Sequence, residues 1–241
     1  MTSGRQALPD GGHGAAADGD RVTDDGDVLR RLRTDTAPEH EAVEQALDLM
    51  DAGLTPARLA TVLTLMHGFW AAAEAGLDGW AAAEPAAAAG LQWADRRRLH
   101  LFAADLAALG VAPAGAAERP DLPAVSDTGA ALGRLYVLEG STLGGVFIDR
   151  HLATLPQLTG TGRLRSFSPY GERTGTMWHG FRSAAREHVA AGGDAGRVVA
   201  AAKQTFTALA TWCGAPVLAQ TGTATPGPRG RATRRNGVRV P

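Results

Sequence analysis

The sequence contains a single cysteine, Cys213, among its 241 residues. One cysteine cannot form an internal disulfide, and it excludes metal sites built from several thiolates. The chain also lacks any run of 18 uncharged apolar residues, and this absence argues against a membrane-spanning helix. Its beginning lacks the basic and then apolar pattern of a secretory signal, so we expect a cytoplasmic protein.

Neither sign of charge is in excess. The chain has 24 Lys and Arg against 25 Asp and Glu, which gives a formal net charge of −1. This balance predicts neither a nucleic-acid partner nor binding to an anionic membrane. The length is sufficient for one domain with a hydrophobic core.

Apolar side chains are scarce at both ends of the chain. Residues 1–27 combine Gly and Ala with six aspartates, and residues 219–241 combine Gly, Thr and Pro with five arginines. Segments of this composition cannot bury enough apolar surface to offset the entropy of ordering the chain. We therefore expect a disordered acidic tail over residues 1–27, a folded domain over 28–218 and a disordered basic tail over 219–241.

Between the tails, apolar residues recur every three or four positions, which is the period of an α-helix with one buried face. Signals for helix starts precede several of these stripes, namely Thr55 with Pro56, Ser126 or Asp127, and Asp194. No segment shows the strict alternation of a β-strand. We predict a single all-α domain of six to eight helices, with apolar stripes over residues 29–50, 59–77, 99–109, about 127–152, 175–189 and 198–212.

A histidine stands at the centre of the first apolar stripe. His40 shares the expected face with Thr36 and Val43, so it is either a hydrogen-bonded core residue or a ligand. Neutral imidazole is a frequent axial ligand of haem iron. Arg33 falls on nearly the same face, about 10 Å away at ~1.5 Å per residue. A cation at that distance either binds a propionate at the edge of a porphyrin or extends into solvent.

Pro38 lies between these two residues and removes the hydrogen bond from residue 38 to residue 34. Either the first helix kinks there, or a new helix begins near Ala37. A kink would move Arg33 relative to His40 and weaken its assignment to a propionate.

Glycines interrupt the apolar stretch LYVLEGSTLGGVFIDRHL, residues 135–152. Gly140 and Gly144 share one helix face, which Gly133 extends, although each glycine costs roughly 0.5–1 kcal/mol relative to alanine inside a helix. Such a face lets a second helix approach closely, or it lets a flat ligand lie on bare backbone. Together with His40 on another helix, the glycines suggest the two sides of a site for a planar macrocycle.

Four segments resemble haem oxygenases, in consistent order along the chain. LRTDTAPEHEAVE (residues 32–44) is similar to the proximal-histidine segment, and YVLEGSTLGG (136–145) resembles the distal-helix signature of the bacterial, biliverdin-producing branch. SFSPYGERTGTMWHGFRSA (166–184) and KQTFTALATWC (203–213) resemble the segments that follow. The resemblance implies an all-helical fold with haem held between a proximal and a distal helix.

The resemblance also implies a reaction and its participants. Haem would be both cofactor and substrate, and O₂ the co-substrate. The ring would be opened at one meso carbon to give biliverdin, ferrous iron and carbon monoxide. Electrons would come from a ferredoxin or a flavoprotein reductase, and a phytochrome-type photoreceptor is a possible acceptor of the biliverdin.

The resemblance assigns roles by position. His40 would ligate the iron, while Gly140 and Gly144 would form the close distal contact. Ser141 occupies the position at which animal enzymes carry an aspartate that orders a water molecule. The remaining site residues are three that match propionate-binding positions and one that would line the pocket: Arg33, Tyr136 and Arg182, and Phe181.

Two other functions stay open from the sequence. A haem carrier or sensor on the same scaffold would keep its haem intact, although an ordinary carrier would not need the glycine face. A thiamine-hydrolysing enzyme of similar helical architecture would need a nucleophile with paired carboxylates. Cys213 has no obvious acidic partner in the sequence, and we expect an inert thiol.

Overall fold

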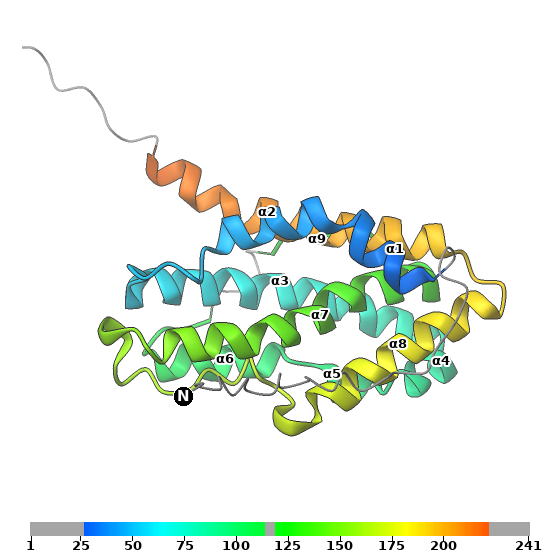
Figure 1. Ribbon diagram of the computed structural model, residues 1–241, viewed down its shortest axis with the longest axis horizontal. Coiled ribbons are helices and arrows are strands. Elements are labelled where there is room, and N and C mark those ends of the chain that lie inside the picture. The colour runs from blue at the N-terminus through cyan, green and yellow to red at the C-terminus, as the bar shows by residue number, and fades with distance from the viewer. Residues whose placement is uncertain (1–26, 114–118, 222–241) are drawn as a thin grey trace, which may run out of the picture.

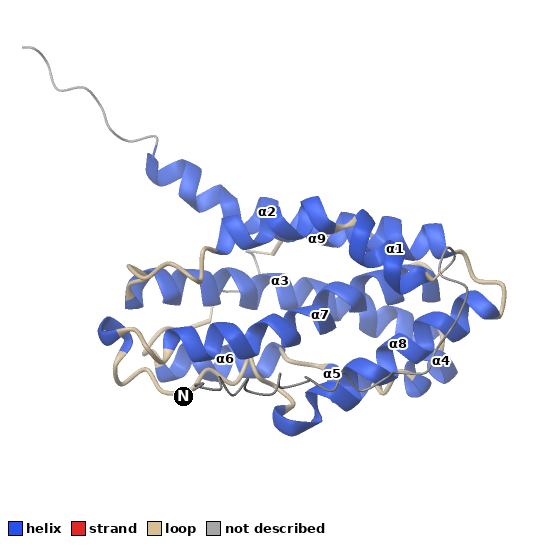
Figure 2. Ribbon diagram, viewed as in Figure 1, coloured by secondary structure: helices blue, strands red, loops and turns tan. Residues whose placement is uncertain are grey.

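The computed structural model describes residues 27–113 and 119–221. In these ranges all regular structure is helical and there is no strand (Figure 2), so the predicted all-α fold is confirmed. The α-helices are α1 (Val28–Asp35), α2 (Ala37–Leu47), α3 (Pro56–Ala83), α4 (Pro85–Gly90), α5 (Trp93–Arg96), α6 (Leu99–Ala108), α7 (Thr128–Leu152), α8 (Thr174–Ala190) and α9 (Ala195–Thr221). Two 3₁₀ helices, η1 (Pro156–Leu158) and η2 (Gly171–Arg173), lie between α7 and α8.

The described ranges thus hold nine α-helices, one more than the upper limit expected from the sequence. The first predicted stripe divides into α1 and α2, and the short helices α4 and α5 had no stripe long enough to indicate them. The two predicted tails lie outside the described residues, apart from Asp27 and the end of α9 at residues 219–221.

The helices form one bundle (Figure 1). α1 and α2 lie along α9, α3 packs against α6, and α7 contacts both α8 and α9. The colours of Figure 1 also give the chain directions: α2, α7 and α9 run the same way, and α3 and α8 run the opposite way. No helix within the described ranges has the length and hydropathy needed to cross a membrane.

The predicted starts of two long helices are confirmed by side-chain caps. The Thr55 hydroxyl accepts a hydrogen bond from the backbone N–H of Arg58 at 3.2 Å, with Pro56 as the first residue of α3. The Asp127 carboxylate accepts one from the N–H of Ala130 at 2.7 Å, so Asp127 rather than Ser126 caps α7. Each cap satisfies a backbone donor that the first helical turn leaves without a partner.

The helix is interrupted at Thr36, between α1 and α2 and two residues before Pro38. The Thr36 hydroxyl donates to the Leu32 carbonyl at 2.6 Å, and α2 starts at the next residue, Ala37. Of the two outcomes expected from Pro38, the start of a new helix is therefore the one found. Pro38 fits the first turn of α2, where a helix needs no N–H donor.

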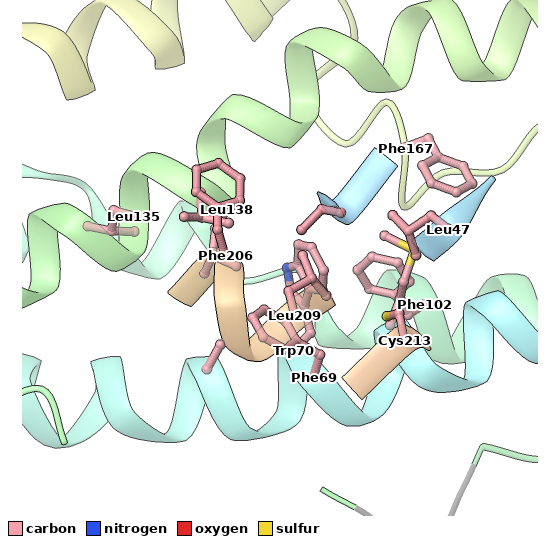
Figure 3. Close-up of a cluster of buried hydrophobic side chains, with 14 of the residues drawn as sticks. Leu47, Phe69, Trp70, Phe102, Leu135, Leu138, Phe167, Phe206, Leu209 and Cys213 are labelled. Carbon is pink, nitrogen blue, oxygen red and sulfur yellow. The ribbon is translucent and has the colours of Figure 1, made fainter. Parts of the chain in front are cut away.

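The core lies where α3, α6, α7 and α9 meet (Figure 3). Trp70 of α3 and Phe102 of α6 are buried with ring centroids 4.7 Å apart. Cys213 of α9 lies in the same cluster, fully covered by apolar side chains. Burial raises the pKa of the Cys213 thiol to about 12, so it stays protonated at neutral pH.

Helix α7 contacts its neighbours through bare backbone at two glycines. A Cβ on Gly133 would lie 2.3 Å from the Val198 carbonyl oxygen of α9, and a Cβ on Gly145 would lie 2.0 Å from the Phe167 carbonyl oxygen. Gly133 continues the face of Gly140 and Gly144 by its spacing, as expected, but unlike them it is covered. Gly133 is the point at which α7 packs against α9.

Substitution by alanine should have opposite effects on stability at Gly145 and at Gly144. Gly145→Ala should lower the free energy of unfolding by about 1–3 kcal/mol, because the new methyl group meets backbone that has no room to shift. Gly144→Ala meets no atom within 4 Å and should leave stability unchanged or raise it by up to ~1 kcal/mol. Urea denaturation followed by circular dichroism measures both values. Equal destabilisation by the two substitutions would contradict this account of α7.

Candidate functional site

The middle of α7 presents an open face at Gly140 and Gly144. A Cβ built on either residue meets nothing within 4 Å, in contrast to Gly133 and Gly145 on the same helix. A glycine face can allow close approach of a second helix, but no second helix approaches Gly140 or Gly144 among the described residues. Two apolar side chains on the same stretch of α7, Leu143 and Phe147, are exposed, and 66% of Phe147 is accessible.

The start of this face lies beside the break between α1 and α2. Thr36 and Arg33 lie near the phenol of Tyr136, which belongs to α7. Burial raises the pKa of Tyr136, and these two contacts oppose the rise only in part, so the phenol is a neutral hydrogen-bonding group. Phe206 of α9 contacts the rings of both Tyr136 and His40, at centroid distances of 6.2 and 5.6 Å.

His40 and Gly140 stand in equivalent places relative to that contact. Each lies four residues, about one helical turn, beyond its contact residue, Thr36 in one case and Tyr136 in the other. α2 and α7 run in the same direction (Figure 1), so each residue follows its contact residue in the same sense along the bundle. Phe206 thus links the His40 ring to the ring of Tyr136, one turn before Gly140.

His40 itself is not a core residue. Its side chain is 56% exposed, and only the ring of Phe206 is described in aromatic contact with it. The alternative of a hydrogen-bonded core histidine is therefore wrong. The His40 Nδ1 atom lies 3.7 Å from the Glu44 carboxylate, one turn later on α2, which leaves Nε2 as the nitrogen directed away from that acid.

A buried arginine, Arg98, holds Ser141 in place. The Ser141 hydroxyl donates to the Leu138 carbonyl at 2.7 Å and accepts from the Arg98 guanidinium at 3.0 Å. Arg98 also donates to the Leu138 carbonyl and lies over the ring of Trp70, 5.0 Å from its centroid. Hydroxyl and guanidinium donors on one mid-helix carbonyl favour a bend of α7 at the glycine segment.

Carboxylates compensate the buried charges beneath this segment. Glu139 pairs with Arg96 and accepts a hydrogen bond from the Tyr170 hydroxyl at 2.8 Å. Glu74 of α3 accepts the backbone N–H groups of Arg98 and Leu99 at 2.7 and 2.9 Å, at the start of α6. Burial raises the pKa of Glu74, while these two donors and the Arg98 charge oppose the rise.

The other predicted site residues are placed as follows. Arg33 is exposed at the end of α1, close enough to Tyr136 to act on its charge state. Phe181 is fully buried, stacked on Trp178 at 5.2 Å, and reaches the region only through its contact with Tyr136 at 6.2 Å. Arg182 lies near Asp27, the cap of α1; burial raises the pKa of Asp27, but its hydrogen bond with Arg186 holds it below the usual value, and the charge of Arg182 adds to this effect.

Comparison with known proteins gives a structural match. No family model and no curated protein matches the sequence. Among solved structures, the NO- and CO-bound heme oxygenase from Neisseria meningitidis superposes with a TM-score of 0.59 at 24% sequence identity, covering 85% of this chain and 98% of that one. The chain has the haem oxygenase fold. At this identity the match shows the fold alone, and the roles of individual residues remain predictions.

The structure adds residues that the sequence did not single out. Thr36 and Phe206 link Tyr136 to the α1–α2 break and to His40, and Arg98 anchors Ser141. Thr36 and Phe206 have the sequence signature of ordinary face residues, and Arg98 lies 43 residues from the serine that it contacts. Burial also disfavours the thiamine-hydrolysing alternative, because the Cys213 thiol is protonated and enclosed by apolar groups.

The anchoring of Ser141 predicts unequal effects of two substitutions. Arg98→Met should lower the free energy of unfolding by about 3–5 kcal/mol, because it removes a buried cation that faces Glu74 and Glu139. Ser141→Ala should cost about 1 kcal/mol or less, since Arg98 still donates to the Leu138 carbonyl. Guanidinium denaturation monitored by tryptophan fluorescence measures both; a cost below 1 kcal/mol for Arg98→Met would rule out the anchor.

Proposed function

We propose that this protein is a haem-degrading monooxygenase that opens the porphyrin ring at a meso carbon. The observation that carries the proposal is the open backbone face at Gly140 and Gly144, and the exposed imidazole of His40 would face it. The fold match supports it, because the matched structure is a haem oxygenase. Biliverdin, ferrous iron and carbon monoxide are the proposed products.

The residues of this region fit a haem group. At Gly140 and Gly144 the backbone of α7 is open, and exposed apolar side chains lie beside it. A flat macrocycle requires an apolar surface of this kind. The exposed imidazole of His40 would hold the iron, and Arg33 and Tyr136 would bind a propionate. When bound, haem supplies both the iron that takes up O₂ and the ring that is oxidised.

The protein's own contribution is orientation and control of polarity. Glu44 lies 3.7 Å from Nδ1 of His40, so it would favour Nε2 as the nitrogen that holds the iron, as carboxylates do for many metal-binding histidines. In residues 136–147 the single acid is Glu139, and it is buried in its pair with Arg96. Within this stretch of α7 no carboxylic acid is therefore free to donate a proton above the ring, and the Ser141 hydroxyl is engaged with the Leu138 carbonyl and Arg98.

Arg182 and Phe181 take supporting places in this proposal. Arg182 would bind a second propionate, and Asp27 does not hold it, because Asp27 is paired with Arg186; Phe181 packs against the ring of Tyr136. We assign the propionate contact first to Arg33, which is exposed and next to Tyr136. The exposed surface around Arg33 would also receive the electron donor, a ferredoxin or a flavoprotein reductase. Biliverdin would then leave for an acceptor such as a phytochrome-type photoreceptor.

An anaerobic hemin titration followed by admission of O₂ tests the activity. The protein should first give a saturable Soret band, because a ligated haem absorbs differently from free hemin. With O₂ and a reductant, that band should disappear as a bilin band grows, and chromatography should identify the bilin isomer. A Soret band that persists under turnover conditions would instead identify a haem carrier or sensor and reject the oxygenase.

The iron ligand is tested by His40→Ala against His100→Ala. Both histidines are exposed on helices, but His40 belongs to α2 and His100 to the first turn of α6. His40→Ala should remove the spectrum of histidine-ligated haem and abolish ring opening, and added imidazole should restore the spectrum. His100→Ala should behave as the unsubstituted protein. An unchanged spectrum in His40→Ala would refute the assignment of the ligand.

The glycine face is tested by Gly144→Ala against Gly79→Ala. Both glycines lie in long helices with open space around the Cβ position, so neither substitution should harm folding. Only Gly144→Ala should weaken hemin binding, by about tenfold or more, since a lost contact worth ~1.4 kcal/mol changes affinity tenfold. Equal hemin affinity in the two variants, measured by absorbance titration, would argue that haem does not rest on α7.

A further inference from the structure

One buried cation has no counter-charge among the described residues. Arg134 of α7 is only 4% exposed, and the Pro123 carbonyl is the one hydrogen-bond acceptor described for its guanidinium. Its Nε–H is buried without a partner. A guanidinium carries five N–H donors, so most of its hydrogen-bonding capacity is unused.

The other buried arginines of the described ranges are treated differently. Arg96 pairs with Glu139, and Arg98 is stabilised by the charges of Glu139 and Glu74. For Arg134 no charge among the described residues offsets the loss of solvation, and burial lowers the pKa of its guanidinium to about 10. An uncompensated buried charge is costly to a folded protein, so its presence calls for a partner outside the described chain.

A cavity of about 180 Å³ lies against this guanidinium. At ~30 Å³ per water molecule, it holds roughly six waters, or one small anion with some of its hydration. Its polar lining includes Arg134 and Arg197, together with Gln204 and the buried Thr205 of α9. Arg197 is 37% exposed at the rim and is paired with Asp127 at 3.2 Å.

The surrounding backbone makes room for the guanidinium. A Cβ on Gly76 of α3 would lie 2.3 Å from Nη1 of Arg134, so any larger residue there would push the guanidinium out of its place. The segment that ends at Asp127 covers the other side, through the Pro123 carbonyl and the Val125 side chain. The arginine is therefore held in a fixed place beside the cavity.

We propose that this cavity is a binding site for a small oxyanion, a phosphate or carboxylate group, held by Arg134 at its base and by Arg197 at its rim. The planar guanidinium matches both groups, because each offers two oxygens to a pair of parallel N–H donors. The anion would supply the charge that Arg134 lacks. The site is separate from the proposed haem site, since none of its lining residues has a role there.

Titration of the full chain with inorganic phosphate tests the site. In Tris buffer at constant ionic strength set with NaCl, phosphate should raise the melting temperature in a saturable way beyond the effect of chloride. The ¹H–¹⁵N signal of the Arg134 Nε–H should shift with the same concentration dependence. Acetate and citrate in parallel titrations distinguish a carboxylate group from a phosphate as the preferred ligand.

Three substitutions make the test specific. Arg134→Met should fold, with a melting temperature in chloride equal to or above that of the unsubstituted protein, and it should lose the response to phosphate. Arg197→Gln should keep the response but need about tenfold more phosphate, because the rim cation is lost. Arg163→Gln also breaks an exposed Arg–Asp pair, with Asp149, but far from the cavity, and should respond normally.

Two results would overturn the proposal. One is that neither phosphate, acetate nor citrate stabilises the protein more than chloride does. The other is that Arg134→Met responds to the anion as the unsubstituted protein does. If Arg134→Met does not fold, the same response in Arg197→Gln overturns the proposal. The hemin titration does not enter this experiment, so each proposal can fail without the other.

Discussion

Contact between bare backbones fixes the position of α7, and the rest of the molecule is arranged around that helix. At Gly133 it meets the backbone of α9, and at Gly145 it meets the carbonyl of Phe167, at distances that no side chain permits. Between these two points Arg98 holds the Leu138 carbonyl from below. A helix fixed at both ends and in the middle can leave the glycines between them uncovered without losing its place. The cost of glycine in a helix is thereby offset by close packing at two positions, and at Gly140 and Gly144 it leaves a surface on which a ligand can lie.

Buried charge separates two kinds of position in the structure. Arg96 and Arg98 each face a carboxylate and hold together helices that are distant in sequence, so their charges belong to the fold. Arg134 is as deeply buried and yet faces a cavity instead of an acid. The contrast is informative because the chain has acidic residues to spare, 25 in all, and places none of the described ones beside this arginine. A cation treated in this way fits a binding site better than it fits a structural pair.

Local signals in the sequence were sufficient for most of the helical architecture. Caps at Thr55 and Asp127 gave the starts of α3 and α7, and the resemblance to haem oxygenases gave the fold that the structural match confirms. Long-range relations were not accessible in this way. The opposite surroundings of Gly133 and Gly140 look identical in the sequence, because both are glycines on an apolar helix. The exposure of His40 was also missed, since helical periodicity identifies a face but not whether another element covers it.

The break at Thr36 determines how His40 can face α7. A continuous helix through residues 28–47 would carry His40 along the axis of α1, which packs against both α8 and α9. Because Pro38 starts a new helix, α2 follows α9, and Phe206 of α9 separates the His40 ring from Tyr136. Thr36 and Tyr136 lie near one another, each one turn before a residue of the proposed site, His40 and Gly140. His40 and Tyr136 are thus linked through one aromatic ring, that of Phe206, which a continuous helix through Thr36 would not place between α2 and α7.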